Sequence, residues 1–344
     1  MPSSRPPWLR HDAHLAHDVP GHPERPARIR ALEAEMSAHD WFGCERVEAP
    51  RADLSLIDAV HAEPFVTALQ EMCARGGGRI DADTVALEGT YEAALRAAGG
   101  AAALVDALLG EGARTGVSAL RPPGHHAETA RAMGFCFFDN VAVAARRARD
   151  AHGAERVLVL DWDVHHGNGT NEIFHADPGV LFVSIHESPL YPGTGPASDV
   201  GSGPGEGYTV NLPVPAGTGD AGYRSLVEHV TGALIADWRP QLVLLSAGFD
   251  AHRDDPLAGC RVSEAGYAGM TASIRRAADE VGAPLGLVLE GGYDLGALSR
   301  SMAALMPVLV AEQTPAPEDL PVHPLAARAL ARLAPYWPGL RAAS

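Results

Sequence analysis

The 344-residue chain is predicted to fold as one three-layer α/β/α domain around a central, mostly parallel sheet. Two observations lead to this fold class. Short apolar runs alternate with stretches rich in Ala, Arg and Glu, whose apolar residues recur at three- and four-residue steps. Most of the short runs are continuously apolar, which is typical of strands buried on both faces of a parallel sheet. No internal repeat or linker interrupts the alternation, so we expect a single domain over residues 1–344.

The expected elements follow in chain order from these two patterns. Strands are expected at Thr115–Ala119, Arg156–Leu160, Val180–Ile185, Tyr208–Leu212, Leu242–Ser246 and Leu285–Leu289. Helices are expected at Arg25–His39, Glu63–Arg75, Thr90–Leu109, Asn140–His152, Tyr223–Asp237, Ser263–Val281 and Leu298–Ala311. A Pro-rich connector then leads to an amphipathic helix at His323–Tyr336. It belongs to a C-terminal extension, about residues 317–344, that is expected to cap the core or to join two subunits of a homo-oligomer.

Composition excludes several classes of function. The chain has 27 Lys and Arg against 43 Asp and Glu, a net charge of −16, and no basic run, which argues against a nucleic-acid surface. The four cysteines are scattered and form no CxxC pair, as in a reduced cytosolic protein. No apolar leader is found, and no stretch reaches the roughly 18–20 apolar residues of a membrane span. We therefore expect a cytoplasmic protein that does not engage a membrane.

The polar motifs of this chain share one position, directly after predicted strands. Ligand sites of open α/β sheets lie beyond the carboxyl ends of the strands, so residues delivered there by several strands are expected to meet. The residues delivered in this way are His125 and His126 after the first strand, Asp161, Asp163 and His165 after the second, Asp250 after the fifth and Tyr293 after the sixth.

Asp163 and His165 are two residues apart, so on an extended segment both side chains point to the same side. Asp250 is the best placed acidic residue from another strand to complete a metal site. Two carboxylates and one imidazole suit Zn²⁺ acting as a Lewis acid and water activator. Fe²⁺, Mn²⁺ and Co²⁺ fit the same donors.

The histidine pair is expected to supply the proton chemistry beside that metal, because the pKa of histidine lies near physiological pH. Each ring needs a partner on its other nitrogen, and Asp161 and Asn168 are candidates. Tyr293 follows two glycines that let the backbone approach closely, so its hydroxyl could donate to a developing oxyanion.

Several strings of the chain closely resemble the zinc-dependent histone deacetylases: GHPERPAR, RPPGHHA, GFCFFDN, DWDVHHGNGT, SIHESPLYPGTG, SAGFDAH and LEGGYD. They are most similar to the class II branch and its bacterial deacetylase and acetylpolyamine amidohydrolase relatives. The resemblance extends from about residue 9 to residue 310. It implies the arginase-like α/β fold with a central parallel sheet of eight strands.

Position by position, the resemblance implies a role for each motif residue. Asp163, His165 and Asp250 would hold zinc, and Tyr293 would polarise the scissile carbonyl. His126 would be the general base, with His125 beside it as electrostatic partner or acid. Asp161 would orient His125, and Asn168 would lie behind His126. Asn168 matches class II, whereas the class I pattern has aspartate there.

The resemblance also implies structural potassium and a substrate channel. One K⁺ would lie near the zinc against Asp161, Asp163, His165, Ser184 and Ile185, and a second against Phe174, Asp177, Val180 and Tyr208. The acyl-lysine channel would be lined by Phe135 and Tyr191, with Gly134 beside Phe135, Leu257 at the rim and Asp83 gripping the substrate backbone. Arg28 would lie near an internal acetate exit.

The function that follows is removal of acetyl or other acyl groups from acetylated amines by metal-activated water, with N-acetyl-lysine side chains of proteins as the favoured substrate. An acetylpolyamine or small-metabolite amidohydrolase is the alternative. Polyamine-selective relatives place a glutamate where this chain has Leu257, although Asp254, Asp255 or Glu24 could supply negative charge. A non-catalytic binder of acetylated ligands and an arginase-type ureohydrolase are less favoured, because the catalytic set is complete and a two-manganese site would need more aspartates.

Overall fold

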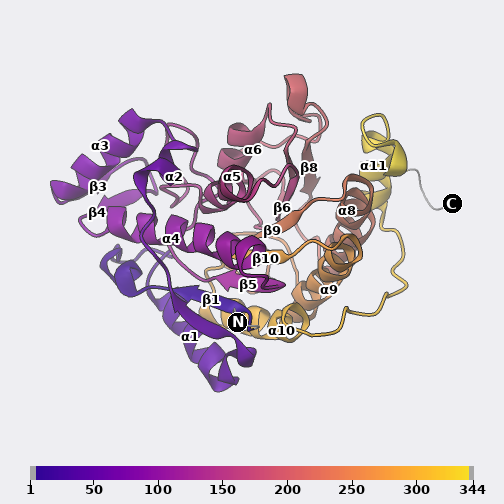
Figure 1. The fold of residues 1–344 in the computed structure, drawn as a ribbon, viewed down its shortest axis with the longest axis horizontal. Coiled ribbons are helices and arrows are strands. Elements are labelled where there is room, and N and C mark those ends of the chain that lie inside the picture. Colours follow the sequence, from indigo (N-terminus) through magenta and orange to yellow (C-terminus); the bar gives the residue numbers. More distant parts are fainter. Residues whose placement is uncertain (1–4, 341–344) are drawn as a thin grey trace.

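The computed structural model describes residues 5–340 and has at its centre one eight-stranded sheet (Figure 1). The strand order is β2-β1-β5-β10-β9-β6-β7-β8, and every neighbouring pair is parallel. The predicted parallel sheet of eight strands is therefore confirmed. Its strands are β1 (Pro7–Arg10), β2 (Glu45–Glu48), β5 (Thr115–Ser118), β6 (Val157–Asp161), β7 (Val180–Glu187), β8 (Thr209–Val214), β9 (Leu242–Ala247) and β10 (Leu285–Leu289).

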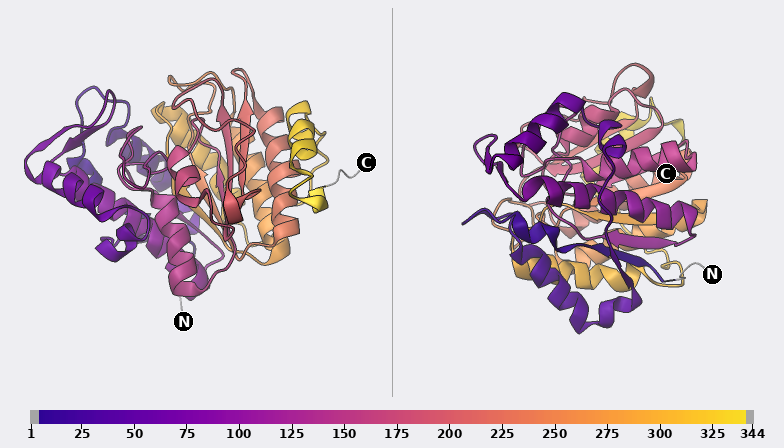
Figure 2. Two further views of the ribbon diagram at one scale, coloured as in Figure 1. Left: turned by 90° about the horizontal axis from the view of Figure 1, so that it is seen from above. Right: turned by 60° about the vertical axis from the view of Figure 1, so that its left-hand side comes forward.

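Helices cover both faces of this sheet (Figure 2). Successive residues of β6 show why: Leu158 and Leu160 belong to one hydrophobic cluster, and Val157 and Val159 belong to another. The first cluster contains residues of α1 (Ala27–Ala38), α7 (Asp220–Leu226), α8 (Gly232–Trp238), α9 (Glu264–Val281), α10 (Leu295–Leu309) and α11 (Pro324–Leu333). The second contains residues of α2 (Leu54–Asp58), α3 (Glu63–Ala74), α4 (Thr90–Val105), α5 (Asn140–His152) and α6 (Asn168–Phe174).

The elements differ from the sequence expectations in a few places. Strands β1 and β2 were not predicted, because each has only four residues and β2 lies largely exposed at the sheet edge. The antiparallel hairpin of β3 (Gly77–Arg79) and β4 (Val85–Leu87) was also missed. The single helix expected at Tyr223–Asp237 starts earlier and is divided into α7 and α8 by a π-helical turn, Val227–Thr231.

Capping residues fix the helices that border the functional loops. The side chains of Asp139, Ser263 and Asp294 accept backbone N–H groups at the starts of α5, α9 and α10. Gly153 and Gly282 end α5 and α9 in the left-handed conformation that glycine adopts without strain. Because Asp294 directly follows Tyr293, the start of α10 also fixes the place of that tyrosine.

One helical stretch corrects the expectation that no segment could cross a membrane. Thr90–Gly110 is long and apolar enough by length and composition, with a mean hydropathy of 1.4. However, 67% of that window is buried inside the protein, where α4 packs against α5 and contributes to the second hydrophobic cluster. Such burial is what a core helix of a globular domain shows.

The described part of the C-terminal extension, up to residue 340, packs on the first hydrophobic cluster, and residues 341–344 lie outside the described residues. Its helix is shorter than the expected His323–Tyr336, and buries Ala326, Ala329 and Leu333, followed by Trp337. The Trp337 indole donates to the carbonyl of Gly207 beside β8. The extension therefore caps the core, and a part in joining two subunits stays a prediction.

A fully buried ion network connects the N-terminal segment to the sheet. Glu24 binds Arg121 through both carboxylate oxygens and Arg28 at 3.2 Å. Arg121 also donates to the backbone carbonyls of His14 and His17. Burial alone would raise the pKa of Glu24, but the charges of Arg121 and Arg28 outweigh it and lower the pKa to about 2. The carboxylate is therefore ionised throughout the neutral range.

We expect Glu24→Gln to lower the free energy of unfolding by about 3–5 kcal/mol at pH 7, because two buried guanidinium groups lose their counter-charge. Urea denaturation measures the change. Since folding lowers the pKa of Glu24 from 4.5, its contribution is present above pH 4.5 and is lost as the pH falls toward 2. Glu35→Gln on the exposed face of α1 is the control, with an expected change below about 0.5 kcal/mol. Equal effects of the two variants would contradict the argument.

Candidate active site

Two carboxylates and one imidazole meet at the carboxyl ends of β6 and β9. Nδ1 of His165 lies 3.1 Å from Oδ1 of Asp163 and 3.2 Å from Oδ2 of Asp250. One donor atom from each of the three residues lies within 4.8 Å of the other two, and all three residues are buried. The strands bring them together because β6 and β9 are adjacent, with Asp161 paired to Ser246 at their ends.

Backbone groups and two glycines hold these carboxylates in place. The N–H of Gly291 donates to Asp163 Oδ2 at 2.9 Å, and the N–H of Val164 donates to Asp250 Oδ1 at 2.9 Å. A Cβ atom on Gly248 would lie 2.1 Å from Asp163 Oδ2, and one on Gly291 would lie 2.2 Å from Asp250 Oδ2. Only glycine leaves room for the carboxylates at these two positions.

The electrostatics of this group favour a bound cation. Burial lowers the pKa of His165, but its hydrogen bonds to Asp163 and Asp250 outweigh burial and raise the pKa to about 10. Burial and the charge of Asp163 both raise the pKa of Asp250. The two buried carboxylates thus share one imidazole, which can compensate only one negative charge. The other negative charge is costly to bury without a counter-charge. The donor set fits a divalent metal ion, which would neutralise both carboxylates and bind the imidazole nitrogen.

The two histidines expected to handle protons lie side by side with different partners. Their ring centroids are 4.0 Å apart. Nδ1 of His125 lies 2.8 Å from Asp161 Oδ2, and Nδ1 of His126 lies 2.8 Å from Asn168 Oδ1. Burial lowers both pKa values, but the charges of Asp163 and Asp161 raise that of His125 well above its ordinary value. Burial and the neighbouring His125 keep the pKa of His126 well below its ordinary value, so His126 is neutral.

Tyr293 is held over these groups by contacts to its ring and backbone. The Arg28 guanidinium lies 5.0 Å from its ring centroid and donates to the carbonyl of Gly292 at 2.6 Å. The N–H of Tyr293 donates to Asp255 Oδ2 at 2.6 Å. Burial raises the pKa of the phenol well above its ordinary value, so the hydroxyl keeps the proton that it would donate.

The channel residues implied by the resemblance surround one cavity of about 230 Å³. Larger hollows beside α11 contain none of the motif residues. Arg28 does not line the cavity but lies behind the ring of Tyr293. Leu190 was missed, although it precedes Tyr191 in the string SIHESPLYPGTG. The lining residues are Asp83, His126, Gly134, Phe135, His165, Leu190, Tyr191, Leu257 and Tyr293.

The wall residue Phe135 has a strained backbone. Gly134 and Phe135 have φ values of 56° and 68°, and the turn that they form is closed by hydrogen bonds between Met133 and Cys136. Left-handed backbone is unfavourable for a bulky residue and tends to occur at functional sites. A Cβ at Gly134 would lie 2.3 Å from the ring of His126, so glycine is required beside that histidine.

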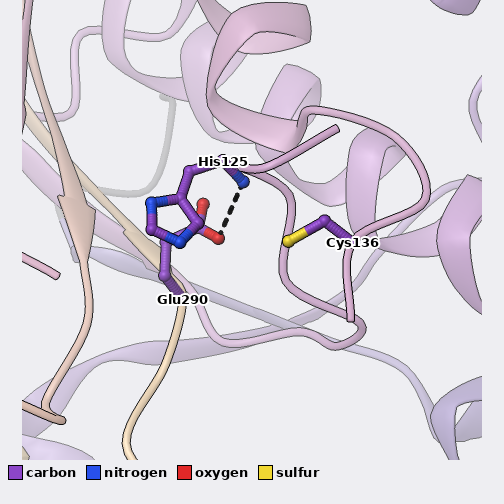
Figure 3. Close-up of side chains that lie close together, drawn as sticks. All are labelled: His125, Cys136 and Glu290. Carbon is purple, nitrogen blue, oxygen red and sulfur yellow. Dashed lines mark hydrogen bonds between the residues drawn. The ribbon is translucent and has the colours of Figure 1, made fainter. Parts of the chain in front are cut away.

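A second buried group consists of His125, Cys136 and Glu290, and it was not expected from the sequence (Figure 3). Glu290 Oε2 accepts the backbone N–H groups of His125 at 3.2 Å and of Gly124 at 2.7 Å. Burial raises the pKa of Glu290 to about 8. Glu290 therefore ties the segment that carries Tyr293 to the segment that carries the histidines.

The residues implied for potassium lie near one another, but their geometry does not identify an ion. Asp161 and Ser184 are paired across β6 and β7, and Ile185 follows in β7. In the second set, the carbonyls of Phe174, Asp177 and Tyr208 already accept backbone N–H groups, that of Asp177 from Val180. Both potassium positions stay predictions.

Comparisons with known proteins agree with this geometry. The histone deacetylase domain family matches residues 22–309. A probable deacetylase of Archaeoglobus fulgidus is 40% identical over 294 residues, which cover 84% of this chain and 81% of that protein. A histone deacetylase-like amidohydrolase of Pseudomonas aeruginosa is 38% identical over 277 residues, covering 79% and 73%. The crystal structure of an HDA15 HD domain superposes with a TM-score of 0.90 at 37% identity, covering 98% of this chain and 97% of that one. The chain belongs to the histone deacetylase family.

Proposed function

We propose that this protein is a zinc-dependent deacetylase that hydrolyses acetylated amines, with N-acetyl-lysine side chains of proteins as its favoured substrates. The observation that carries the proposal is the convergence of a metal-type donor set, a neutral histidine and a protonated tyrosine around one cavity. A non-catalytic binder of acetylated ligands would not need this complete set. An arginase-type ureohydrolase is set aside, because the chain belongs to the deacetylase family.

Asp163, His165 and Asp250 would hold Zn²⁺, and Fe²⁺, Mn²⁺ or Co²⁺ would suit the same donors. When bound, the metal supplies Lewis acidity that polarises the amide carbonyl and lowers the pKa of water. A structural K⁺ at each of the two implied positions is part of the same proposal. All described cysteines are buried and unpaired, which supports a reducing compartment, and we propose the cytoplasm.

The neutral His126 acts as the general base. Its Nδ1 is engaged with Asn168, so Nε2 remains to accept the proton of the attacking water. His125 is held by Asp161 and carries positive charge, which stabilises negative charge that develops on the substrate. One of the two histidines then protonates the departing amine, as general acid catalysis requires.

The hydroxyl of Tyr293 donates to the oxyanion that forms from the substrate carbonyl. Since burial keeps the phenol protonated, this donor is available across the neutral pH range. Phe135 and Tyr191 provide flat aromatic walls for an aliphatic chain, with Phe135 edge-on to Tyr293 at a centroid distance of 5.7 Å. These walls suit the four methylene groups of an acyl-lysine side chain.

The mouth of the cavity favours acetyl-lysine over acetylpolyamine. Leu257 lines it where a polyamine-selective relative would have glutamate. The substitute charges considered from the sequence are engaged elsewhere: Glu24 is buried against Arg121, Asp254 pairs with Arg300, and Asp255 accepts the N–H of Tyr293. None of the three lines the cavity, which supports the acetyl-lysine proposal, and a replacement of the missing glutamate by one of them stays a prediction. Asp83 lines the cavity and is available to accept a substrate N–H, and a small acetylated amine stays the alternative substrate.

We expect Tyr293→Phe to reduce kcat about 10²–10³-fold, because one oxyanion donor is lost. Steady-state deacetylation of an acetyl-lysine peptide measures the change, and metal analysis checks that the variant still binds its ion. Tyr336→Phe, at an exposed tyrosine outside the cavity, is the control and should retain kcat. Undiminished turnover of Tyr293→Phe would refute the role given to this hydroxyl.

A substrate panel tests the proposed specificity. We expect kcat/KM for acetyl-lysine peptides to exceed the values for acetylputrescine and acetylspermidine by at least about 10-fold, since Leu257 replaces the glutamate that would bind a second ammonium group in polyamine-selective relatives. Leu257→Glu should raise kcat/KM for the acetylpolyamines and lower it for peptides. Higher kcat/KM of the wild type for acetylpolyamines would replace the peptide proposal with the polyamine one.

A further inference from the structure

We propose that Glu128 is a positioning residue that fixes the orientation of the Asn168 amide and, through it, the tautomer of His126. The inference rests on the proposed function, in which His126 is the general base. Glu128 contacts neither the metal donors nor the cavity. In this proposal it nevertheless determines which ring nitrogen of His126 carries the hydrogen.

The Asn168 amide has chemically distinct neighbours at its two ends. Its Oδ1 lies 2.8 Å from Nδ1 of His126. Its Nδ2 lies 2.8 Å from Oε1 of Glu128, 3.4 Å from the carbonyl oxygen of His126 and 3.4 Å from Sδ of Met133. The three groups on the nitrogen side can only accept hydrogen bonds. The carboxylate is the strongest acceptor among them.

This arrangement determines the tautomer of His126. Because Oδ1 of Asn168 can only accept, Nδ1 of His126 must carry the hydrogen, and Nε2 keeps the lone pair that a base needs. With the amide reversed, its N–H would face Nδ1, the hydrogen would move to Nε2, and His126 could not accept a proton. The chemistry of the surrounding groups is what separates these two orientations of an amide.

The partner of the other histidine does not present this choice. Asp161 offers two carboxylate oxygens to His125, both acceptors, so its orientation leaves the tautomer of His125 unchanged. An asparagine in the equivalent place behind His126 therefore needs a neighbour that distinguishes its oxygen from its nitrogen. Glu128 is that neighbour.

The backbone of Glu128 is held firmly enough to act in this way. Its carbonyl accepts Nδ1 of the buried His61 at 3.0 Å, and its N–H donates to the carbonyl of Arg131 at 2.9 Å. The next residue, Thr129, is bound through its N–H and hydroxyl to the carboxylate of Glu172, which lies one turn after Asn168 in α6. The hydrogen bonds of the Asn168 amide go to other groups. Glu172 is thus a nearby carboxylate of α6 that holds the turn but does not bind the Asn168 amide.

The kinetic test replaces each of these two acids by lysine in the metal-loaded enzyme. In Glu128→Lys the ammonium group attracts Oδ1 of Asn168 and favours the reversed amide. We expect kcat to fall at least about 10-fold, with KM unchanged within about two-fold, since a charge-assisted hydrogen bond is replaced by a competing donor. Glu172→Lys removes the hydrogen bonds to Thr129 but no partner of the Asn168 amide, so its loss of kcat should be clearly smaller. An unchanged kcat in Glu128→Lys, or equal losses in both variants, would overturn the proposal.

The same substitution in an Asn168→Asp background separates orientation from general damage. A carboxylate has no donor end to reverse, so Glu128→Lys should cause no loss of kcat relative to Asn168→Asp alone. It is expected to raise kcat, because it removes a second carboxylate from close contact with the first. A loss of the same size in both backgrounds would show that Glu128 acts on folding or charge and not on the amide.

A spectroscopic measurement determines the tautomer of His126 directly and does not depend on catalytic turnover. With ¹⁵N-labelled histidines, two-bond ¹H–¹⁵N correlations distinguish Nδ1–H from Nε2–H, and His126→Gln identifies the signal among the 16 histidines. We expect Nδ1–H in the wild type and Nε2–H to increase in Glu128→Lys. Nε2–H in the wild type would refute the inference even if every variant were active. Conversely, a wild type with Nδ1–H that hydrolyses no acetylated amine would refute only the proposed function.

Discussion

The placement of two buried carboxylates against one imidazole at the ends of β6 and β9 is the constraint on which the rest of the structure depends. Burying two negative charges is unfavourable unless a cation and hydrogen bonds compensate them. The surrounding chain supplies such hydrogen bonds, because backbone N–H groups donate to both Asp163 and Asp250. Glycines occupy the positions where a side chain would collide with the two carboxylates. The Gly-Gly pair before Tyr293 is therefore explained as much by Asp250 as by the tyrosine.

The same negative charges separate the two neighbouring histidines into different chemical states. His125 lies against Asp161 and close to Asp163, and its pKa is raised. His126 faces a neutral amide and the charged His125, and its pKa is lowered. One fold thus places a charged and a neutral imidazole with ring centroids 4.0 Å apart, which suits the proposed roles of electrostatic partner and base at the same pH. In this view the identity of residue 168 matters, because an aspartate there would change the charge behind the base.

Much of this arrangement could be read from the sequence, because strand ends and motif spacing are local. The motif residues directly follow strands, and parallel strands bring their carboxyl ends to one edge of the sheet. The pairing of β6 with β9, which skips β7 and β8, was not predicted. The contacts missed join segments far apart in sequence: Glu128 to Asn168, Glu290 to Gly124, and Asp255 to Tyr293. No pattern within one segment indicates them. Strands β1 and β2 were missed because each is short and β2 is largely exposed, so neither has the continuous apolar run of the central strands.

The central claim is that Asp163, His165 and Asp250 bind one catalytic metal ion, and metal analysis of the purified protein tests it most directly. We expect one divalent ion per chain, loss of deacetylation on chelation, and recovery when zinc is added back. Asp250→Asn should bind far less metal while remaining folded. Full turnover by metal-free protein, or an unchanged metal content in Asp250→Asn, would contradict the account.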